Sequence, residues 1–330
     1  MDLSTNYLTL PLKNPLIAGA SPLGARLDSA LRLEEAGVAA ITLHSLFEEQ
    51  IELERNAQWH QIAAFEESFG EALNFLPRRE EFDLTPHQYL DHLSCLAEAL
   101  EIPVIASLNG TTLGGWVEYA SLLEDAGADA LELNYYDLPT NPLISGHEVE
   151  LTALEILNAI RKTVTIPISI KLSPFFIALP HFARRLVDFG VNGIVLFNRF
   201  YQPEIVLDDL EVRPQLHLSD PGELNLRLRW LAILSPQIRT SFAITGGVHT
   251  AEDVLKSVMV GASAVQMVSA LLKNGPAQVS QVLAGVEEWL RDHQYDSLQQ
   301  LRGCLNLATT PDPSGYERAN YMRILQSWKT

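Results

Sequence analysis

The chain has 330 residues, of which 47% are hydrophobic and 19% are charged, and its formal net charge is −18. This composition is ordinary for a globular enzyme with a large core, and the acidic excess argues against binding to nucleic acid or to an anionic membrane surface. The two cysteines, Cys95 and Cys304, do not have metal-site spacing, no apolar run reaches 18 residues and the N-terminus has no signal-peptide pattern, so we expect a cytoplasmic protein without a bound metal or a membrane span.

In chain order, short apolar runs alternate with helical segments. Residues 6–12 fit a short N-terminal hairpin strand. The long charged segment 47–85 has no clear strand, and we expect it to contain helical pieces and to cover the mouth of the barrel that is predicted below. Residues 201–218 are a second insertion. The predicted strands are residues 15–21, 39–46, 103–108, 130–135, 167–172, 193–197, 242–244 and 264–268, and the predicted helices are residues 28–36, 86–100, 115–125, 148–162, 179–189, 224–234, 251–260 and 276–294.

Eight such units predict a parallel sheet with right-handed crossovers, closed into a (β/α)8 TIM barrel. Glycine ends the helix before every second strand, at Gly37, Gly127, Gly190 and Gly261, as in left-handed helix caps. No G-x-G-x-x-G motif follows the first strand, so the dinucleotide-binding fold lacks its fingerprint. We expect a single domain, with a barrel core at about residues 14–295 and a helical tail at residues 296–330.

The clearest site signal is the strand–turn–helix–strand stretch at residues 241–270. Gly246 and Gly247 lie where its first strand ends, and Val268 and Ser269 end the second. Adjacent strand-end loops late in an α/β barrel are typical of a phosphate site, because glycine lets backbone N–H groups approach the ligand. The alternative is that the glycine pair is only a turn.

Barrel chemistry takes place at the C-terminal ends of the strands, where this chain places small, polar and amide side chains. Lys171 lies in an otherwise apolar strand, and it is either a cation beside a cofactor ring, a Schiff-base amine, or a lysine that reaches the rim. Asn134 either binds a planar heterocycle or is a buried amide satisfied by the backbone. Glu132 shares the face of Asn134 and needs a partner if it points into the barrel.

These residues lie in segments that resemble the soluble, class 1 dihydroorotate dehydrogenases, which are FMN-dependent (β/α)8 barrels. The matching segments are residues 14–21 (NPLIAGAS), 131–134 (LELN), 170–174 (IKLSP), 182–186 and 243–276. The resemblance implies that Lys171 contacts the isoalloxazine ring, where negative charge grows on reduction, and that Gly246, Gly247, Val268 and Ser269 hold the FMN phosphate. The other cofactor-binding positions that it implies are Ala20, Ser21, His44, Asn109, Asn134, Asn198 and Gly222.

The chain departs from the family pattern at the substrate site. Asp137 stands where the family has its Cys or Ser base, His44 replaces a lysine, and residues 72–78 keep only Leu-Pro of the substrate-gripping loop. A carboxylate suits this role only if burial, for example against Tyr135 and Tyr136, raises its pKa or if the substrate proton is more acidic. The alternative is that Asp137 is a solvated loop residue.

The sequence therefore predicts an FMN-dependent oxidoreductase with Asp137 and Lys171 as catalytic residues, which oxidises a CH–CH group of dihydroorotate or a related small molecule. A homodimer is a further expectation. Two alternatives stay open: a non-redox phosphate-binding lyase or isomerase that uses Lys171 as a Schiff-base amine, and a flavin-binding protein without turnover.

Overall fold

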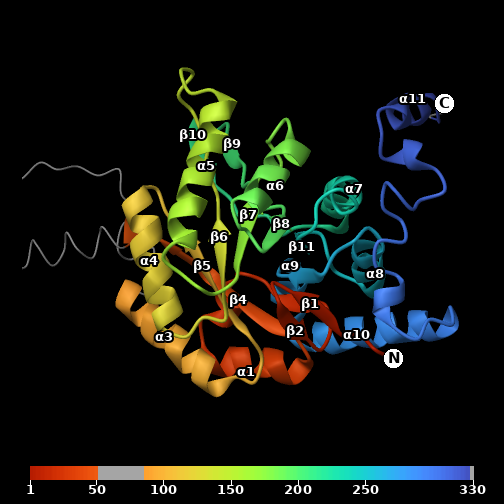
Figure 1. Ribbon diagram of the computed structural model, residues 1–330, viewed down its shortest axis with the longest axis horizontal. Helices are drawn as coiled ribbons and strands as arrows, with labels where there is room; N and C mark the ends of the chain where they lie inside the picture. The colour runs from red at the N-terminus through yellow and green to blue at the C-terminus, as the bar shows by residue number, and fades with distance from the viewer. Residues whose placement is uncertain (51–84, 328–330) are drawn as a thin grey trace, which may run out of the picture.

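The computed structural model describes residues 1–50 and 85–327, and its centre is a closed barrel of eight parallel strands (Figure 1). Strand neighbours follow the chain order, and the last strand pairs with the first to close the barrel. The predicted (β/α)8 TIM barrel is therefore confirmed. The barrel strands are β3 (Leu16–Ala18), β4 (Ala40–Phe47), β5 (Val104–Asn109), β6 (Ala130–Asn134), β7 (Ile168–Leu172), β8 (Gly193–Leu196), β11 (Ser241–Thr245) and β12 (Ala264–Met267).

Helices surround the barrel and carry the chain from each strand to the next (Figure 1). Gly37, Gly127, Gly190 and Gly261 all have φ between 97° and 116°, a region that suits glycine, so the predicted helix caps are confirmed. The helices are α1 (Leu27–Ala36), α3 (Pro86–Ala99), α4 (Leu113–Asp125), α5 (Gly146–Arg161), α6 (Leu179–Asp188), α7 (Leu224–Leu234), α8 (Ala251–Met259), α9 (Ser269–Asn274) and α10 (Ala277–Asp292). Only α9, which begins directly after the last strand, was not predicted among these.

A two-stranded hairpin closes the N-terminal end of the barrel. Its strands are β1 (Thr5–Tyr7) and β2 (Leu10–Leu12), so the single segment expected at residues 6–12 is a complete hairpin. Tyr7 and Leu8 are buried among the lowest inward-facing side chains of the barrel. A Cβ atom at Gly193 would lie 2.3 Å from Leu8 Cδ2, which shows how tightly this floor is packed. Among the described residues, the hairpin therefore closes the N-terminal end of the barrel and not the C-terminal end.

Most of the first insertion, from residue 51 to residue 84, lies outside the described residues, and so does the family's substrate loop at residues 72–78. Its start is fixed by Glu48, whose carboxylate accepts hydrogen bonds from the backbone N–H groups of Thr111 at 2.5 Å and Thr112 at 2.7 Å and from both hydroxyl groups. Burial raises the pKa of Glu48, but these hydrogen bonds outweigh it and hold the pKa below its usual value.

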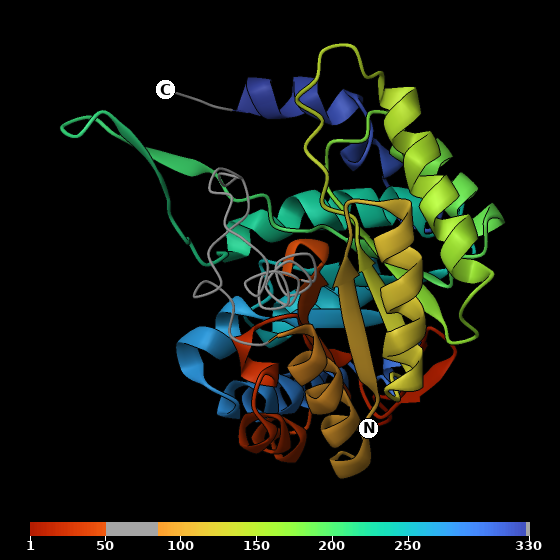
Figure 2. The same ribbon diagram turned by 90° about the vertical axis from the view of Figure 1, so that its left-hand side faces the viewer.

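The second insertion contains a hairpin that the sequence did not predict. Strands β9 (Pro203–Val206) and β10 (Glu211–Pro214) pair antiparallel and extend away from the barrel (Figure 2). Seven of their eight residues are exposed and each strand has a proline at one end, so no buried face imposes the alternation that marks a strand. Arg213 holds the hairpin together, with its Nη2 atom 2.6 Å from Asp209 Oδ2.

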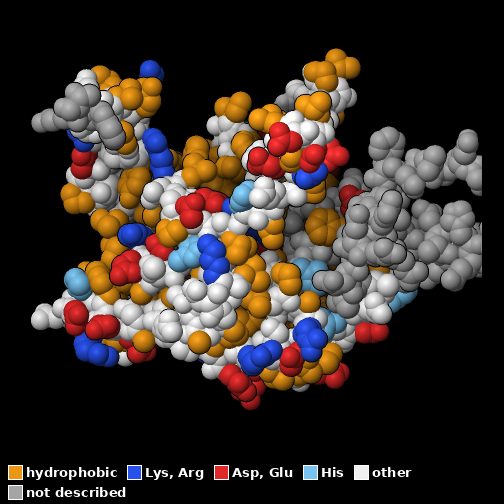
Figure 3. All heavy atoms as spheres, turned by 180° about the vertical axis from the view of Figure 1, so that it is seen from behind, with side chains coloured by type: hydrophobic (Ala, Val, Ile, Leu, Met, Phe, Trp, Pro, Cys, Tyr) orange, Lys and Arg blue, Asp and Glu red, His pale blue; other side chains and the backbone are white. Residues whose placement is uncertain are grey.

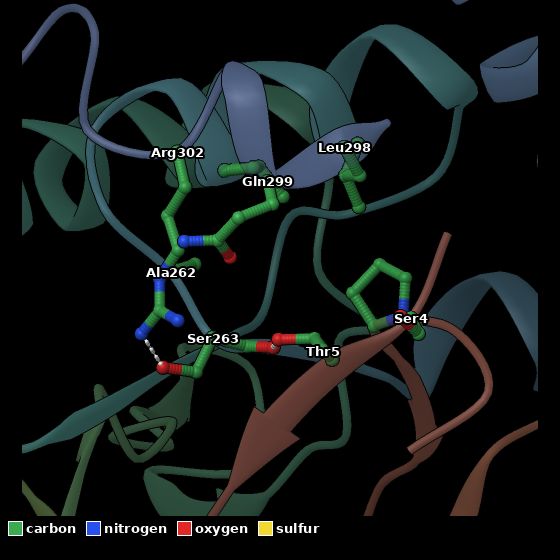
Figure 4. A pocket seen from close by; sticks show the side chains of 9 residues that line it. Ser4, Thr5, Ala262, Ser263, Leu298, Gln299 and Arg302 are labelled. Carbon is green, nitrogen blue, oxygen red and sulfur yellow. Dashed lines mark hydrogen bonds between the residues drawn. The ribbon is translucent and has the colours of Figure 1, made fainter. Parts of the chain in front are cut away.

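The C-terminal tail follows α10 and contains η4 (Leu298–Gln300), η5 (Pro313–Gly315) and α11 (Ala319–Ser327), which confirms that the tail is partly helical. Its beginning packs against the N-terminus, where Thr5, Ser263 and Arg302 line a small pocket and Arg302 donates a hydrogen bond to Ser263 Oγ (Figure 4). Ser263 immediately precedes β12, so this pocket lies at the opposite end of the barrel from the strand ends that carry the predicted chemistry.

The surface carries its acidic side chains in several separate groups, interspersed with basic and hydrophobic ones, on the face shown in Figure 3. Among the residues that the structure describes, no helix combines the length and apolar character that crossing a membrane requires. Nor does that part of the chain contain a cluster of three or more side chains suited to binding a metal ion.

Candidate active site

A buried ion pair lies inside the barrel, close to the C-terminal ends of the strands. Lys171 Nζ on β7 is 2.7 Å from Glu132 Oε1 on β6, and the two side chains are only 7% and 0% exposed. Gln266 on β12 donates from Nε2 to the other carboxylate oxygen at 2.6 Å. Glu132 therefore points inward and has the partners that its position required. Lys171 does not reach out to the solvent, so the interpretation of this residue as a rim lysine is wrong.

Three asparagines meet above this pair. Asn109 at the end of β5 donates to the backbone oxygen of Asn134 at 2.8 Å, and Asn198, which follows β8, donates to Asn134 Oδ1 at 2.6 Å. Asn134 in turn donates to Ser45 Oγ on β4 at 3.0 Å, and Ser45 shares a 2.8 Å hydrogen bond with Ser107. The side-chain amide of Asn134 is thus satisfied mainly by other side chains. The alternative that the backbone satisfies this amide is therefore wrong.

The glycine pair forms a tight loop beneath an adjoining segment of chain. Gly246 and Gly247 have φ of 85° and 80°, and a Cβ atom at Gly247 would lie 2.6 Å from the backbone nitrogen of Leu224. A side chain is therefore excluded both by conformation and by space. The N–H of Gly247 donates to Ser219 Oγ at 3.2 Å, and Ser219 Oγ lies 2.8 Å from Ser269 Oγ. The two predicted phosphate loops are thus brought together through Ser219.

The remaining predicted cofactor residues surround this loop pair or lie across the barrel from it. Ala20 and Ser21 follow β3, which pairs with β12, and a Cβ at the preceding Gly19 would lie 2.8 Å from Val268 Cγ2. Gly222 lies in η3 (Pro221–Glu223), above the glycine loop, where its N–H donates to Asp220 Oδ1 at 2.8 Å.

His44 lies in β4 where the strand register with β5 shifts, between Thr42 and Ser45. Its ring is edge-on to Tyr89, with centroids 5.1 Å apart, and its backbone oxygen accepts a 2.8 Å hydrogen bond from the Tyr89 hydroxyl. The structure thus places His44 against the α3 side of the strand, and its cofactor role stays a prediction.

Asp137 follows β6 and is exposed, whereas Tyr135 is buried. Burial, and second the charge of Asp137, raise the pKa of Tyr135, so the two groups are close. Among the described residues nothing buries the Asp137 carboxylate, so the expected burial against Tyr135 and Tyr136 is wrong for them. Whether Asp137 acts as a base stays a prediction.

An aromatic group lies at the same rim, and of its three members the sequence singled out only Tyr136. Tyr136 stacks on Phe200 with ring centroids 4.9 Å apart and an interplanar angle of 20°, and Phe175 meets Phe200 edge-on, also at 4.9 Å. The three residues follow β6, β7 and β8, so loops far apart in sequence build one surface. Phe175 is 63% exposed, which leaves a ring face available to a ligand.

Residues 77–290 match the family model of dihydroorotate dehydrogenase. The chain belongs to the dihydroorotate dehydrogenase family. It is 30% identical over 221 residues to the putative dihydroorotate dehydrogenase A (fumarate) of Aeropyrum pernix, across 64% of this chain and 70% of that protein. It is 23% identical over 313 residues to the catalytic subunit of dihydroorotate dehydrogenase B (NAD(+)) of Endomicrobium trichonymphae, across 92% and 97%. Subunit PreA of the NAD-dependent dihydropyrimidine dehydrogenase of Escherichia coli is 23% identical over 333 residues, across 94% and 78%.

Dihydroorotate dehydrogenase family members are oxidoreductases that act on CH–CH donors, and they bind FMN. The residues of this chain fit such a cofactor: a loop that only glycine can occupy suits a phosphate, and one buried ammonium with three amides suits the polar edge of a planar heterocycle. The lyase or isomerase alternative loses its support, because the matching family and the relatives named above are dehydrogenases.

Proposed function

We propose that this protein is an FMN-dependent oxidoreductase that oxidises a CH–CH group of a small molecule, either dihydroorotate or a related compound. The observation that carries the proposal is the buried ammonium of Lys171, held at the same barrel end as the glycine loop and the three asparagines. Bound FMN would supply the acceptor for a hydride from the substrate. An ammonium buried inside the barrel favours the ligand state that carries more negative charge, since a low dielectric strengthens the attraction.

The other residues would bind and orient the cofactor. Backbone N–H groups at the two strand ends would hold the phosphate, and the amide side chains would hold the ring edge, as the family resemblance implies. The residues assigned to the phosphate are Gly246, Gly247, Val268 and Ser269, and those assigned to the ring and its surroundings are Ala20, Ser21, His44, Asn109, Asn134, Lys171, Asn198 and Gly222.

The assignment of FMN is tested on the purified protein. We expect a yellow protein, or one that becomes yellow on reconstitution, whose acid-released cofactor co-elutes with FMN. FAD in the released fraction, or no bound flavin after reconstitution, would contradict the assignment. A flavin that binds but is reduced by none of a panel of dihydropyrimidines would favour the alternative of binding without turnover.

Asp137 is our candidate for the base, and dihydroorotate is expected to be a poor substrate. The departures at the base and in residues 72–78 support this expectation. The test is anaerobic bleaching of the bound flavin by dihydroorotate in the parent and in Asp137→Asn. Fast bleaching of the parent would refute the poor-substrate claim, and equal rates in both proteins would remove Asp137 from the mechanism.

A further inference from the structure

Arg227 is a buried cation directly behind the glycine loop. It lies on α7 and its side chain is only 6% exposed, yet the ion pair that it forms within the described part of the chain is long, with Nη2 3.7 Å from Glu223 Oε2. Glu223 is itself 30% exposed and also pairs with Arg199 at 3.2 Å. A buried charge is costly unless it is well paired, so the partners seen among the described residues compensate Arg227 only in part.

The guanidinium also fixes the peptide that leads into the loop. Arg227 Nε donates to the backbone oxygen of Thr245, and Nη1 donates to the backbone oxygen of Glu223 at 2.6 Å. In a trans peptide the C=O and the following N–H point in opposite directions. The N–H of Gly246 therefore points away from Arg227, which places the positive end of this peptide dipole on the far side of the loop.

The glycine at position 246 lets the two groups approach this closely. A Cβ atom there would lie 2.7 Å from Arg227 Nη2, so no side chain can separate the guanidinium from the loop backbone. From these contacts we infer that Arg227 is a positioning residue for a phosphate monoester: it orients the Gly246 peptide and supplies positive charge behind it. This inference rests on the proposed FMN function and assigns the preference for FMN over riboflavin to Arg227.

The experiment compares the dissociation constants of FMN and riboflavin, which differ only by the phosphate, by quenching of flavin fluorescence. In Arg227→Gln we expect FMN affinity to fall about 10- to 100-fold more than riboflavin affinity, the size of one interaction with a charged group. The matched control is Arg229→Gln, on the same helix but exposed and bonded to the backbone of Tyr316 and Glu317; it should keep the parent's preference. Arg227→Lys should restore part of the preference, because the charge remains.

If Arg227 had only a structural role, Arg227→Gln would lower the affinities for FMN and riboflavin by the same factor. An unchanged preference for FMN in the folded variant would therefore overturn the inference and leave the proposed function intact. If Arg227→Gln does not fold, the same two dissociation constants are measured in Glu223→Gln. Removing the competing carboxylate should increase the FMN preference, and a preference equal to or below that of the parent would overturn the inference. A parent protein that binds neither flavin would refute the proposed function itself.

Discussion

Replacing Glu132 by glutamine should destabilise the protein strongly. The change keeps the shape of the side chain but leaves Lys171 inside the barrel without its counter-charge, which now lies 2.7 Å away with both side chains at most 7% exposed. Removing one partner of a buried ion pair typically costs about 3–5 kcal/mol. We expect the lower end, about 3 kcal/mol, because the glutamine oxygen still accepts a hydrogen bond.

The measurement is the free energy of unfolding from urea titrations of flavin-free protein, so that ligand binding makes no contribution. Lys171→Met and the double variant complete a cycle, and removing both charges should recover at least about 1 kcal/mol relative to the sum of the single changes. Asp209→Asn is the control: its pair with Arg213 is equally short, at 2.6 Å, but about half exposed, so its loss should cost less than about 1 kcal/mol. Equal losses in Glu132→Gln and Asp209→Asn, or additivity in the cycle, would refute the reasoning.

Two further outcomes follow from the same side chains and from Glu48. Redox titration should show a higher flavin midpoint potential in Glu132→Gln, where Lys171 is uncompensated, and a lower one in Lys171→Met; shifts of the opposite sign would contradict the cation's role. The folded protein lowers the pKa of Glu48 below its usual value of 4.5. The hydrogen bonds of this carboxylate to Thr111 and Thr112 therefore stabilise the fold fully above about pH 4.5, and this stability is lost as the pH falls through the lower pKa of the folded state. Glu48→Gln should therefore flatten the acid limb of stability against pH, and an unchanged slope would contradict this.

The barrel itself could be predicted because its signals are local. Each strand is a short apolar run, and before every second strand a glycine cap ends the preceding helix, so periodicity and turn chemistry agree at those four units. The hairpin β9–β10 could not be found in this way, since its strands are exposed and four residues long. Helix α9 was missed because only Val268 separates it from strand β12, and no glycine, proline or polar turn residue marks the change.

The same difference between local signals and long-range contacts separates the site residues that the sequence could identify from those that it could not. Lys171 and Asn134 could be selected because a polar side chain at the end of an apolar strand stands out in a sequence. The sequence could not identify Gln266, Ser219 and Arg227, because the role of each depends on a contact with another segment of the chain. Gln266, for example, binds Glu132, which lies 134 positions earlier. The signal for Gln266 was present, as a polar residue inside a buried strand, but its partner depends on the barrel's closure. No pattern marks Arg227, which looks like a surface arginine until α7 is docked onto the loop.

The charged layer inside this barrel is hard to explain by stability alone. The floor around Tyr7 and Leu8 is apolar and closely packed, as a barrel interior normally is. Above it, the fold buries a carboxylate, an ammonium and an amide in contact. Apolar side chains of similar volume would often serve folding equally well, because desolvation offsets most of the attraction within a buried pair. The ion pair lies toward the end of the barrel opposite the hairpin, the end that carries the glycine loop and the asparagines. A fixed ammonium at that place is what a ligand that gains negative charge on reduction would need, and this is the physical link between the fold and the proposed flavin chemistry.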